Sequence, residues 1–248
     1  MKVVAIIPAR YDSVRFPGKS LVDICGKLMI QHVYERTSEV SLFEQVIVAT
    51  DDRRIEEAVL NFGGAVQMTS RNHKTGTDRL AEVAQNLDAD IIVNVQGDEP
   101  LIQPAMIEQA IHPLLDNSDV AIGTLKHKIE HPHELFNPNI VKVITDASGR
   151  AMYFSRSPIP CIKGMDMHNE GFWKFAFYRH IGLYAYRRDF LLTFITLPQT
   201  PLEIAEGLEQ LRALEHGYAI IVSETYAESI GVDTPEDLEH ILRVFQKR

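Results

Sequence analysis

Short apolar runs recur along the first part of the chain and are separated by amphipathic segments. The run at residues 3–7 is continuously apolar, as is typical of a strand buried on both faces. Similar runs follow at 45–50, 65–69 and 90–96. Strands that alternate with helices predict parallel βαβ units. We therefore expect an α/β fold whose ligands bind at the carboxyl ends of the strands.

Helical spacing is found between these runs. Apolar residues recur every three or four positions in the segments 30–37, 53–62 and 80–87. Asp51-Asp52 precedes the second segment and can cap it, because a carboxylate accepts hydrogen bonds from the first backbone amides of a helix. Gly63-Gly64 follows that segment and is expected to end it.

The second part of the chain is richer in strands. Strand-like runs lie at 120–125, 141–145, 151–155, 180–186 and 219–223, and a helical pattern spans 204–216. The irregular polar segment 158–178 predicts an excursion from the main sheet. Thr234 as N-cap, with Pro235 in the first helical position, predicts a final helix. Because no linker or repeat is visible, we expect one domain over 1–248, with an insertion or dimerisation segment at about 150–187.

Composition narrows the class of protein. The 248 residues are 45% hydrophobic and 24% charged, as in soluble globular proteins. They contain no apolar run of about eighteen residues, so we expect no membrane span, and the N-terminal run is interrupted too early for a signal peptide. Two distant cysteines, Cys25 and Cys161, indicate the reducing cytoplasm. A net charge of −9 disfavours nucleic-acid binding, so any anion must be bound locally in a cleft.

A basic loop follows the first strand. It reads Pro8-Ala-Arg-Tyr-Asp-Ser-Val-Arg-Phe-Pro-Gly-Lys-Ser20. Arg10, Arg15 and Lys19 provide two guanidinium forks and one ammonium group, which together suit the oxygens of a polyphosphate. Backbone amides of the loop add further donors. A solvated basic loop is the plain alternative, although its position after a buried strand favours a ligand.

The end of this loop resembles a Walker-type phosphate loop only superficially. The pattern G-x-x-x-x-G-K-[ST] requires a glycine at position 13, where the chain has Ser13, and Pro17 stands directly before Gly18. The spacing therefore disfavours an ATPase of that class. No G-x-G-x-x-G follows the first strand either, which disfavours a dinucleotide oxidoreductase.

Two acidic segments are the counterpart of the basic loop. Asp98 follows a strand-like run and Gly97, and Asp233 lies just before the cap of the final helix. Mg²⁺ binds one or two carboxylates together with phosphate oxygens and water, so the pair suits a metal held against a polyphosphate. The alternatives are a turn aspartate for the first and helix-terminus electrostatics for the second.

Other polar segments allow two interpretations. The loop 68–79 contains His73, which lacks a second histidine at metal-ligand spacing, and a Gly76-Thr-Asp turn that can simply begin a helix. The functional alternative for this donor-rich loop is a wall of the nucleotide site. His180, Tyr184 and a further tyrosine share one face of a strand by period two, as a binding wall or as core cover. Glu209-Gln210 lies between leucines on a helix, where a solvated face is the plain alternative.

Taken together, these segments resemble the 3-deoxy-manno-octulosonate (Kdo) cytidylyltransferase family, the CMP-Kdo synthetases. The resemblance covers almost the whole chain, in the expected order. It is carried by Pro-Ala-Arg-Tyr-x-Ser-x-Arg-Phe-Pro-Gly-Lys, Ala49-Thr-Asp-Asp, Met68-Thr-Ser, His73 with Gly76-Thr-Asp-Arg79, Val95-Gln-Gly-Asp-Glu-Pro, Tyr153-Phe-Ser-Arg-Ser-Pro-Ile-Pro, His180-Ile-Gly-Leu-Tyr-Ala-Tyr-Arg, Leu208-Glu-Gln-Leu-Arg and Gly231-Val-Asp.

The resemblance implies a fold, a reaction and partners. The fold is that of the nucleotide-diphospho-sugar transferases, with a Rossmann-like, mostly parallel mixed sheet and helices on both faces. The reaction is CTP plus Kdo giving CMP-Kdo and pyrophosphate, dependent on Mg²⁺, for lipopolysaccharide biosynthesis. A homodimer in the cytoplasm is also implied.

The resemblance also implies roles for individual residues. It assigns Lys19, Asp98 and Asp233 to catalysis, with the two aspartates as the Mg²⁺ ligands. It assigns nucleotide binding to Arg10, Ser13, Arg15, Lys19, Thr69, Ser70, Arg71, Gln96 and Gly97. It assigns sugar binding to Arg156, His180, Tyr184, Glu209 and Gln210.

The chain departs from the family pattern at Ser20, at Lys74-Thr75 and in the variable segment 161–178, none of which is an implied ligand. Two alternative functions remain open. A sibling enzyme would activate another acid sugar, such as 8-amino-Kdo or a sialic acid. A nucleotide-binding regulator would bind CTP without releasing pyrophosphate.

Overall fold

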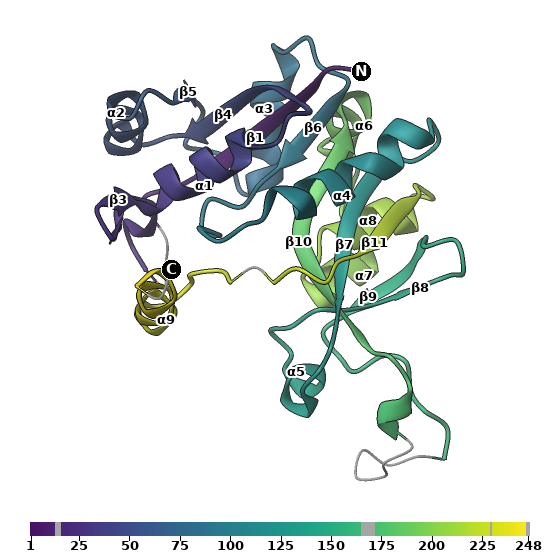
Figure 1. The fold of residues 1–248 in the computed structure, drawn as a ribbon. Coiled ribbons are helices and arrows are strands. Elements are labelled where there is room, and N and C mark those ends of the chain that lie inside the picture. Colours follow the sequence, from purple (N-terminus) through teal and green to yellow (C-terminus); the bar gives the residue numbers. More distant parts are fainter. Residues whose placement is uncertain (13–15, 165–171, 229, 247–248) are drawn as a thin grey trace.

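The computed structural model describes residues 1–12, 16–164, 172–228 and 230–246. Within these ranges the chain forms one nine-stranded sheet and a small two-stranded sheet (Figure 1). The main path runs β11-β7-β10-β6-β1-β4-β5, with β8 attached to β10, and β9 to β8. The strands are β1 Val3–Ala9, β2 Asp23–Ile24, β3 Lys27–Leu28, β4 Phe43–Thr50, β5 Ala65–Met68, β6 Ile91–Asn94, β7 Ile122–Lys128, β8 Lys142–Thr145, β9 Ala151–Ser155, β10 Tyr178–Arg187 and β11 Ile220–Glu224.

Helices connect the strands of the parallel half, as predicted for 30–37, 53–62 and 80–87, whereas the helix that follows β6 was not predicted. The helical segments are η1 Lys19–Leu21, α1 Met29–Ser38, α2 Arg53–Asn61, α3 Gly76–Gln85, α4 Pro104–Asp116, α5 Pro132–Phe136, η2 Phe172–Lys174, α6 Arg188–Phe194, α7 Pro201–Glu206, α8 Gln210–Glu215 and α9 Pro235–Phe245. The predicted cap of α2 is confirmed, because the Asp52 carboxylate accepts from the Arg54 amide at 2.9 Å. The predicted cap of α9 is confirmed by a capping box between Thr234 and Asp237.

The sheet is covered on both faces. One apolar core combines alternate residues of β1 and β6, such as Ile7 and Val93, with α1, α2 and α4. The opposite core combines residues such as Ile6 and Ile92 with α3, α6 and α8. Burial on both faces explains why the strand runs are continuously apolar instead of alternating. The implied α/β fold with a mostly parallel mixed sheet is confirmed by this architecture.

Strand β10 is the antiparallel member of the main sheet. It lies between β6 and β7 and pairs with both in antiparallel register, although its residues fall inside the insertion expected at about 150–187. The part of that segment that leaves the main sheet ends before Tyr178. On β10 two extra residues separate the pairs Ile181↔Leu125 and Tyr184↔Thr124. Because two extra residues are inserted rather than one, side chains before and after the irregularity still point to the same faces of the sheet. His180 and the tyrosines after it therefore share one face of β10, as predicted.

The part of the chain that leaves the sheet contains α5 and η2, which lie below the sheet in Figure 1, next to the β8–β9 hairpin that is attached to β10. A small core of Ile129, Leu135 and Phe177 holds its base. The buried Lys142 ammonium donates to the carbonyl oxygens of Asn137, at 3.0 Å, and Arg156, at 2.6 Å, and so joins β8 to the segment after β9. The dimerisation role expected for this region stays a prediction.

The single helix predicted over 204–216 is instead two helices, α7 and α8. Gly207 adopts the left-handed conformation, with φ of 61°, and ends α7 there. Only glycine adopts this conformation readily, so Gly207 can end the helix although the apolar residues on both sides of it keep helical spacing. Helical spacing alone therefore led to the wrong prediction of one continuous helix. The break places Leu208, Glu209 and Gln210 in a turn at the start of α8.

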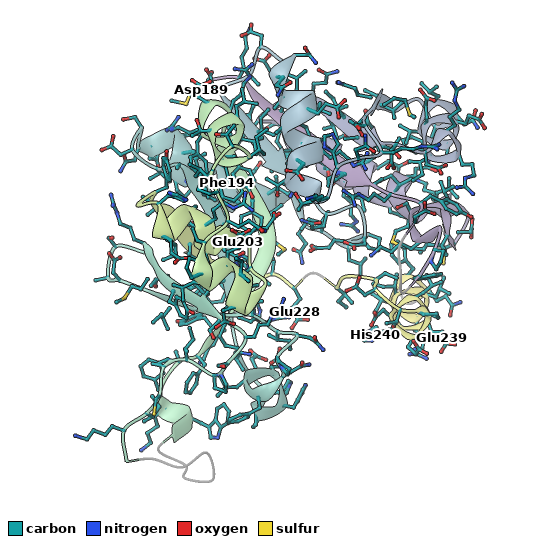
Figure 2. The ribbon with its side chains drawn as sticks, turned by 180° about the vertical axis from the view of Figure 1, so that it is seen from behind. Asp189, Phe194, Glu203, Glu228, Glu239 and His240 are labelled. Atoms are coloured by element: carbon teal, nitrogen blue, oxygen red, sulfur yellow. The ribbon has the colours of Figure 1, made fainter. Side chains whose placement is uncertain are left out.

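The last helix returns to the opposite end of the molecule. An extended segment leaves β11 and carries α9 next to β3 and α1 (Figure 1). Figure 2 shows His240 and Glu239 on this helix, well separated from Phe194 and Glu203 on the helices behind the sheet. Across the described ranges, no helix has the length and apolar character that crossing a bilayer requires.

Candidate functional site

The carboxyl ends of β1 and β6 lie side by side, because these strands pair in parallel register. The basic loop leaves the first and the Gln96-Gly97-Asp98 turn leaves the second. A side chain at Gly97 would place its Cβ 2.8 Å from the Pro8 carbonyl oxygen. The absence of a side chain therefore permits the close approach that brings basic and acidic segments together.

The Lys19 ammonium group lies between the two predicted aspartates. Its Nζ donates to Asp98 Oδ2 at 2.5 Å, to Asp233 Oδ1 at 3.1 Å and to the Val232 carbonyl at 3.2 Å. Burial lowers the pKa of Lys19, but the two carboxylates more than offset this effect, so its pKa is raised. Three residues that are far apart in sequence thus converge on one point.

The C-terminal segment reaches this point through both backbone and core contacts. The Val232 amide donates to the Asp98 carbonyl at 2.9 Å, which holds Asp233 beside the turn after β6. Val232 and Ile241 of α9 pack in one buried cluster with Ile24 and Met29 of the N-terminal region. The docking of α9 therefore sets the position of the second carboxylate.

A hollow of about 250 Å³ opens beside this trio. It is lined by Pro8, Ala9, Arg10, Asp12, Lys19, Ser20, Gln96, Gly97 and Asp98. Among residues 1–12, 16–164, 172–228 and 230–246, no group of three or more His, Cys, Asp or Glu side chains can hold a metal. Two carboxylates that share one cation nevertheless fit Mg²⁺, since this ion completes its shell with substrate phosphates and water.

A second hollow of about 330 Å³ adjoins the first through Arg10. It is lined by Arg10, Tyr11, Asp12, Asp51, Asp52, Arg54 and Arg71. Thr69 is buried below its rim, where its hydroxyl donates to the Thr50 carbonyl at 3.0 Å. The Ser70 amide donates to Glu82 at 2.9 Å. The predicted nucleotide residues Thr69, Ser70 and Arg71 thus lie at the ends of β4 and β5, next to the basic loop.

Arg10 is held in place by backbone carbonyls. Its guanidinium donates to the oxygens of His73, at 2.9 Å, and Thr75, at 3.0 Å, in the segment before α3. The His73 ring contacts Glu82 within the protein, as expected for a loop histidine without a second metal-ligand partner. Ser13 and Arg15, which were also predicted to bind the nucleotide, lie outside the described residues.

A third cavity of about 220 Å³, the tyrosine-lined cavity, lies on the other side of Gln96. It is lined by Gly76, Thr77, Asn94, Gln96, Ile122, Tyr184, Tyr186, Phe194, Gly207, Leu208, Glu209 and Gln210. Gln96 lines this cavity and the hollow beside Lys19, so the two are neighbours. Glu209 and Gln210 face the cavity, and Gln210 is only 7% exposed, so the alternative of a solvated helical face is excluded for this pair.

Three rings follow one another along β10. The His180 and Tyr184 centroids are 5.3 Å apart, and those of Tyr184 and Tyr186 are 5.6 Å apart. Burial lowers the pKa of His180 to about 3. The Thr124 hydroxyl lies 2.9 Å from His180 Nε2 and within hydrogen-bond distance of the carbonyl oxygens of Ile181, at 3.1 Å, and Leu183, at 2.8 Å. Burial, reinforced by nearby Glu209, raises the pKa of Tyr184 and keeps its phenol neutral.

Arg156 lies behind the cavity wall rather than among the residues that line it. Its guanidinium donates to the backbone carbonyls of Glu206, at 2.7 Å, and Pro138, at 3.0 Å. Its amide donates to the Glu206 carboxylate at 2.8 Å. The contacts of Arg156 thus support the break at Gly207 from behind, whereas Tyr184, Glu209 and Gln210 are gathered around the cavity itself.

Sequence reasoning assigned no sugar-binding role to two polar residues of the cavity wall, Thr77 and Asn94, and left open whether Tyr186 forms a binding wall or covers the core. Asn94 follows three apolar strand residues and is 5% exposed, with its Oδ1 unpaired among the described residues. A buried polar residue at the end of an apolar run was the available signal. Thr77 was interpreted as part of a helix start or of a wall of the nucleotide site, and not as part of the sugar cavity.

Comparison with known proteins shows the family to which this chain belongs. The chain matches the family model described as cytidylyltransferase over residues 4–230. It is 60% identical over 246 residues to the 3-deoxy-manno-octulosonate cytidylyltransferase of Geobacter metallireducens, covering 98% of this chain and 97% of the relative. The protein of the same name from Geotalea uraniireducens is 61% identical over 251 residues, covering 100% of both.

Solved structures agree. A CMP:2-keto-3-deoxy-manno-octonic acid synthetase complexed with CTP superimposes with a TM-score of 0.93 at 45% identity, covering 100% of this chain and 99% of the other. A cytidylyltransferase from Leptospira borgpetersenii superimposes with a TM-score of 0.60 at 17% identity, covering 100% of this chain and 94% of the other. The second match shows a common fold alone.

Proposed function

Because the chain belongs to the cytidylyltransferase family, as a member of its 3-deoxy-manno-octulosonate group, we propose that it activates Kdo with CTP. The products are CMP-Kdo and pyrophosphate. The observation that carries this proposal is the position of Gln96, which lines both the hollow beside Lys19 and the tyrosine-lined cavity. A nucleotide bound in the hollow beside Lys19 and a sugar bound in the tyrosine-lined cavity would meet at this residue.

The reaction joins two anions, so positive charge must be supplied where they meet. The anomeric hydroxyl oxygen of Kdo forms a bond to the α-phosphorus of CTP and loses its proton. The bond from that phosphorus to the oxygen of the β-phosphate breaks, and pyrophosphate leaves with the electron pair. Arg10 and Lys19 line the hollow proposed for the triphosphate. Their positive charge there offsets the repulsion between the two anions and stabilises the negative charge that develops on pyrophosphate.

Asp98 and Asp233 are the residues that would hold Mg²⁺. When bound there, the ion supplies charge neutralisation at the α-phosphate and acidifies the attacking hydroxyl. The Lys19 ammonium already draws both carboxylates toward one point. A triphosphate offers this ammonium new oxygen partners and thereby frees the carboxylates as ligands.

The tyrosine-lined cavity suits a polyhydroxylated acid. The Glu209 carboxylate accepts hydrogen bonds only, so it selects hydroxyl groups, while Gln96 and Gln210 both donate and accept. Tyr184 and His180 are neutral, and a row of neutral rings binds a sugar without requiring a compensating charge. We propose Tyr184, Glu209 and Gln210 as direct sugar contacts, with Arg156 acting through the wall behind them.

Several further aspects belong to the same proposal. We propose nucleotide contacts for Ser13 and Arg15 as well as for Arg10 and the Thr69–Arg71 segment, supported by the family membership. We propose Mg²⁺ as cofactor, a cytoplasmic homodimer as the working form and lipopolysaccharide biosynthesis as the destination of the product.

Pyrophosphate release tests the function. The purified chain is incubated with CTP, with and without Mg²⁺, against a panel of Kdo, 8-amino-Kdo and a sialic acid. We expect release with Kdo and Mg²⁺, and little release without the metal. Preference for another acid sugar would favour the sibling enzyme. CTP binding without pyrophosphate from any sugar would favour the regulator.

A further inference from the structure

Thr77 joins three walls of the tyrosine-lined cavity. It is the second residue of α3, is 6% exposed, and lines the cavity together with Tyr186 of β10 and Glu209 at the start of α8. Its hydroxyl donates to Glu209 Oε2 at 2.7 Å, across 132 positions of sequence. Tyr186 lines the same cavity.

The donor and acceptor roles follow from the groups themselves. A carboxylate only accepts, so the single hydroxyl proton of Thr77 is directed to Glu209. Burial raises the pKa of Tyr186 and keeps its phenol neutral in the same cavity. The hydrogen bond from Thr77 holds Glu209 Oε2 and so orients the carboxylate, whose other oxygen, Oε1, can accept from a ligand.

The start of α3 does not need the Thr77 hydroxyl. The helix is capped by Thr75, whose hydroxyl accepts from the Asp78 amide at 3.2 Å, while the Asp78 carboxylate accepts from the Thr75 amide at 3.1 Å. This capping box satisfies the helix terminus by itself. The hydroxyl two positions later therefore serves the cavity and not the helix.

The position of Thr77 is also set from the nucleotide side. Arg10, which lines both nucleotide hollows, holds the carbonyls of His73 and Thr75. This short segment leads directly into the first turn of α3, which contains Thr77. The wall of the sugar cavity is thus anchored on the same arginine that faces the triphosphate.

We propose that Thr77 is a positioning residue for the acid sugar: it orients Glu209 so that the carboxylate accepts a hydrogen bond from a substrate hydroxyl group. Thr77 acts through Glu209 and takes no part in bond making. The inference rests on the proposed function of the cavity, since it requires a polyhydroxylated substrate there.

Steady-state kinetics on four variants test this role. Thr77→Val removes the hydroxyl at nearly constant volume, Thr77→Ser keeps it, and Thr77→Ala is a second removal if valine is not tolerated. Glu209→Ala removes the acceptor and completes a double-mutant cycle. Thr37→Val is the matched control, because Thr37 is a buried helical threonine whose hydroxyl donates to the Val33 carbonyl at 2.7 Å, away from the cavities.

We expect Thr77→Val to raise the KM for Kdo about tenfold, as the loss of one hydrogen bond to a charged group does, with the KM for CTP within about twofold of the unaltered chain. Thr77→Ser should stay close to the unaltered chain. In the Glu209→Ala background, Thr77→Val should add nothing. Thermal unfolding checks that each variant is folded.

Three results would overturn the inference: an unchanged KM for Kdo in Thr77→Val, equal increases for CTP and Kdo, or the same penalty in the Glu209→Ala background. A failure of the proposed function is seen separately, since the unaltered chain would then release no pyrophosphate from Kdo and CTP. In that case the inference is withdrawn together with the function.

Discussion

At the residue scale, the proposed site depends on an ammonium group and two carboxylates that contact one another. Lys19 donates to Asp98 and Asp233, so one ammonium lies between two carboxylates and reduces their mutual repulsion. The basic loop and both carboxylates were predictable from sequence, because cations and acids next to glycine and proline do not suit a core. Their meeting point was not, since 213 positions separate Lys19 from Val232, the residue beside Asp233.

Removing this ammonium should expose the carboxylate pair. We expect Lys19→Met to lose at least about a hundredfold in turnover, as loss of a charge aimed at the transition state does. The same variant should bind Mn²⁺ about tenfold more tightly than the unaltered chain when no nucleotide is present, since the cation that competes for both carboxylates is gone. An electron paramagnetic resonance titration measures this affinity.

Lys2→Met is the control for the metal titration, because it removes an exposed lysine whose partner is Asp88, away from the site. Equal Mn²⁺ affinity in Lys19→Met and in the unaltered chain would show that Lys19 does not shield the pair.

His180, whose ring contacts Tyr184 of the cavity wall, supplies a pH signature of the fold. Its pKa is about 3 in the folded protein, against an ordinary value near 6.5. Between these values the unfolded chain binds the extra proton and the folded chain does not, so acid favours unfolding. We expect stability to fall by about 1.4 kcal/mol for each pH unit below about 6 on account of this residue.

Urea unfolding of the unaltered chain and His180→Gln at several pH values measures this contribution. The variant should lack this part of the slope, whereas His240→Gln, on the exposed face of α9, should retain it. A stability difference between His180→Gln and the unaltered chain that does not vary with pH would contradict the assignment.

At the element scale, the site depends on where elements begin and end. The strands of the parallel half and the helices α1, α2 and α3 followed from apolar periodicity, whereas α4 and α6 were not predicted. The break between α7 and α8 depends on the left-handed Gly207 and was not predicted either. That break turns Glu209 and Gln210 toward the cavity. The central position of β10 was not predicted either, because an antiparallel strand between parallel neighbours depends on contacts distant in sequence.

The close approach of β1 and the turn after β6 gives a test at this scale. In Gly97→Ala the new Cβ would lie 2.8 Å from the Pro8 carbonyl oxygen, so the two strand ends must move apart. We expect the free energy of unfolding to fall by about 1–3 kcal/mol, as for overpacked sites, and turnover to fall about a hundredfold through misplacement.

Gly231→Ala is the matched control, because no atom lies within 4 Å of the position of its Cβ. Denaturant unfolding and pyrophosphate release are measured on both variants. Full turnover in Gly97→Ala would mean that the spacing of the two strand ends does not govern the site.

At the scale of the whole molecule, three distant parts of the chain build one reaction centre. The N-terminal loop brings the cations, the turn after β6 brings Asp98, and the C-terminal segment crosses the molecule to bring Asp233 (Figure 1). The tyrosine-lined cavity, which we propose binds the sugar, has no α9 residue in its wall. The docking of α9 should therefore affect catalysis without affecting the binding of the sugar.

Ile241→Ala separates these two contributions. Ile241 is fully buried against Met29 and Val232, so its truncation should cost about 2–5 kcal/mol locally and loosen the hold on Asp233. We expect kcat to fall while the KM for Kdo stays within about twofold, with Ile204→Ala, at a 67% exposed position, as control. A raised KM for Kdo with unchanged kcat would contradict this division.

The most direct test of the central claim is the Asp98→Asn variant, assayed for CTP affinity and for single-turnover formation of CMP-Kdo at saturating substrates and Mg²⁺. The account places this carboxylate at the point where charge develops, beside Lys19 and Asp233. It predicts a rate lowered at least about a thousandfold, with the Kd for CTP changed by less than about fivefold. A rate close to that of the unaltered chain, or a loss confined to CTP affinity, would contradict it.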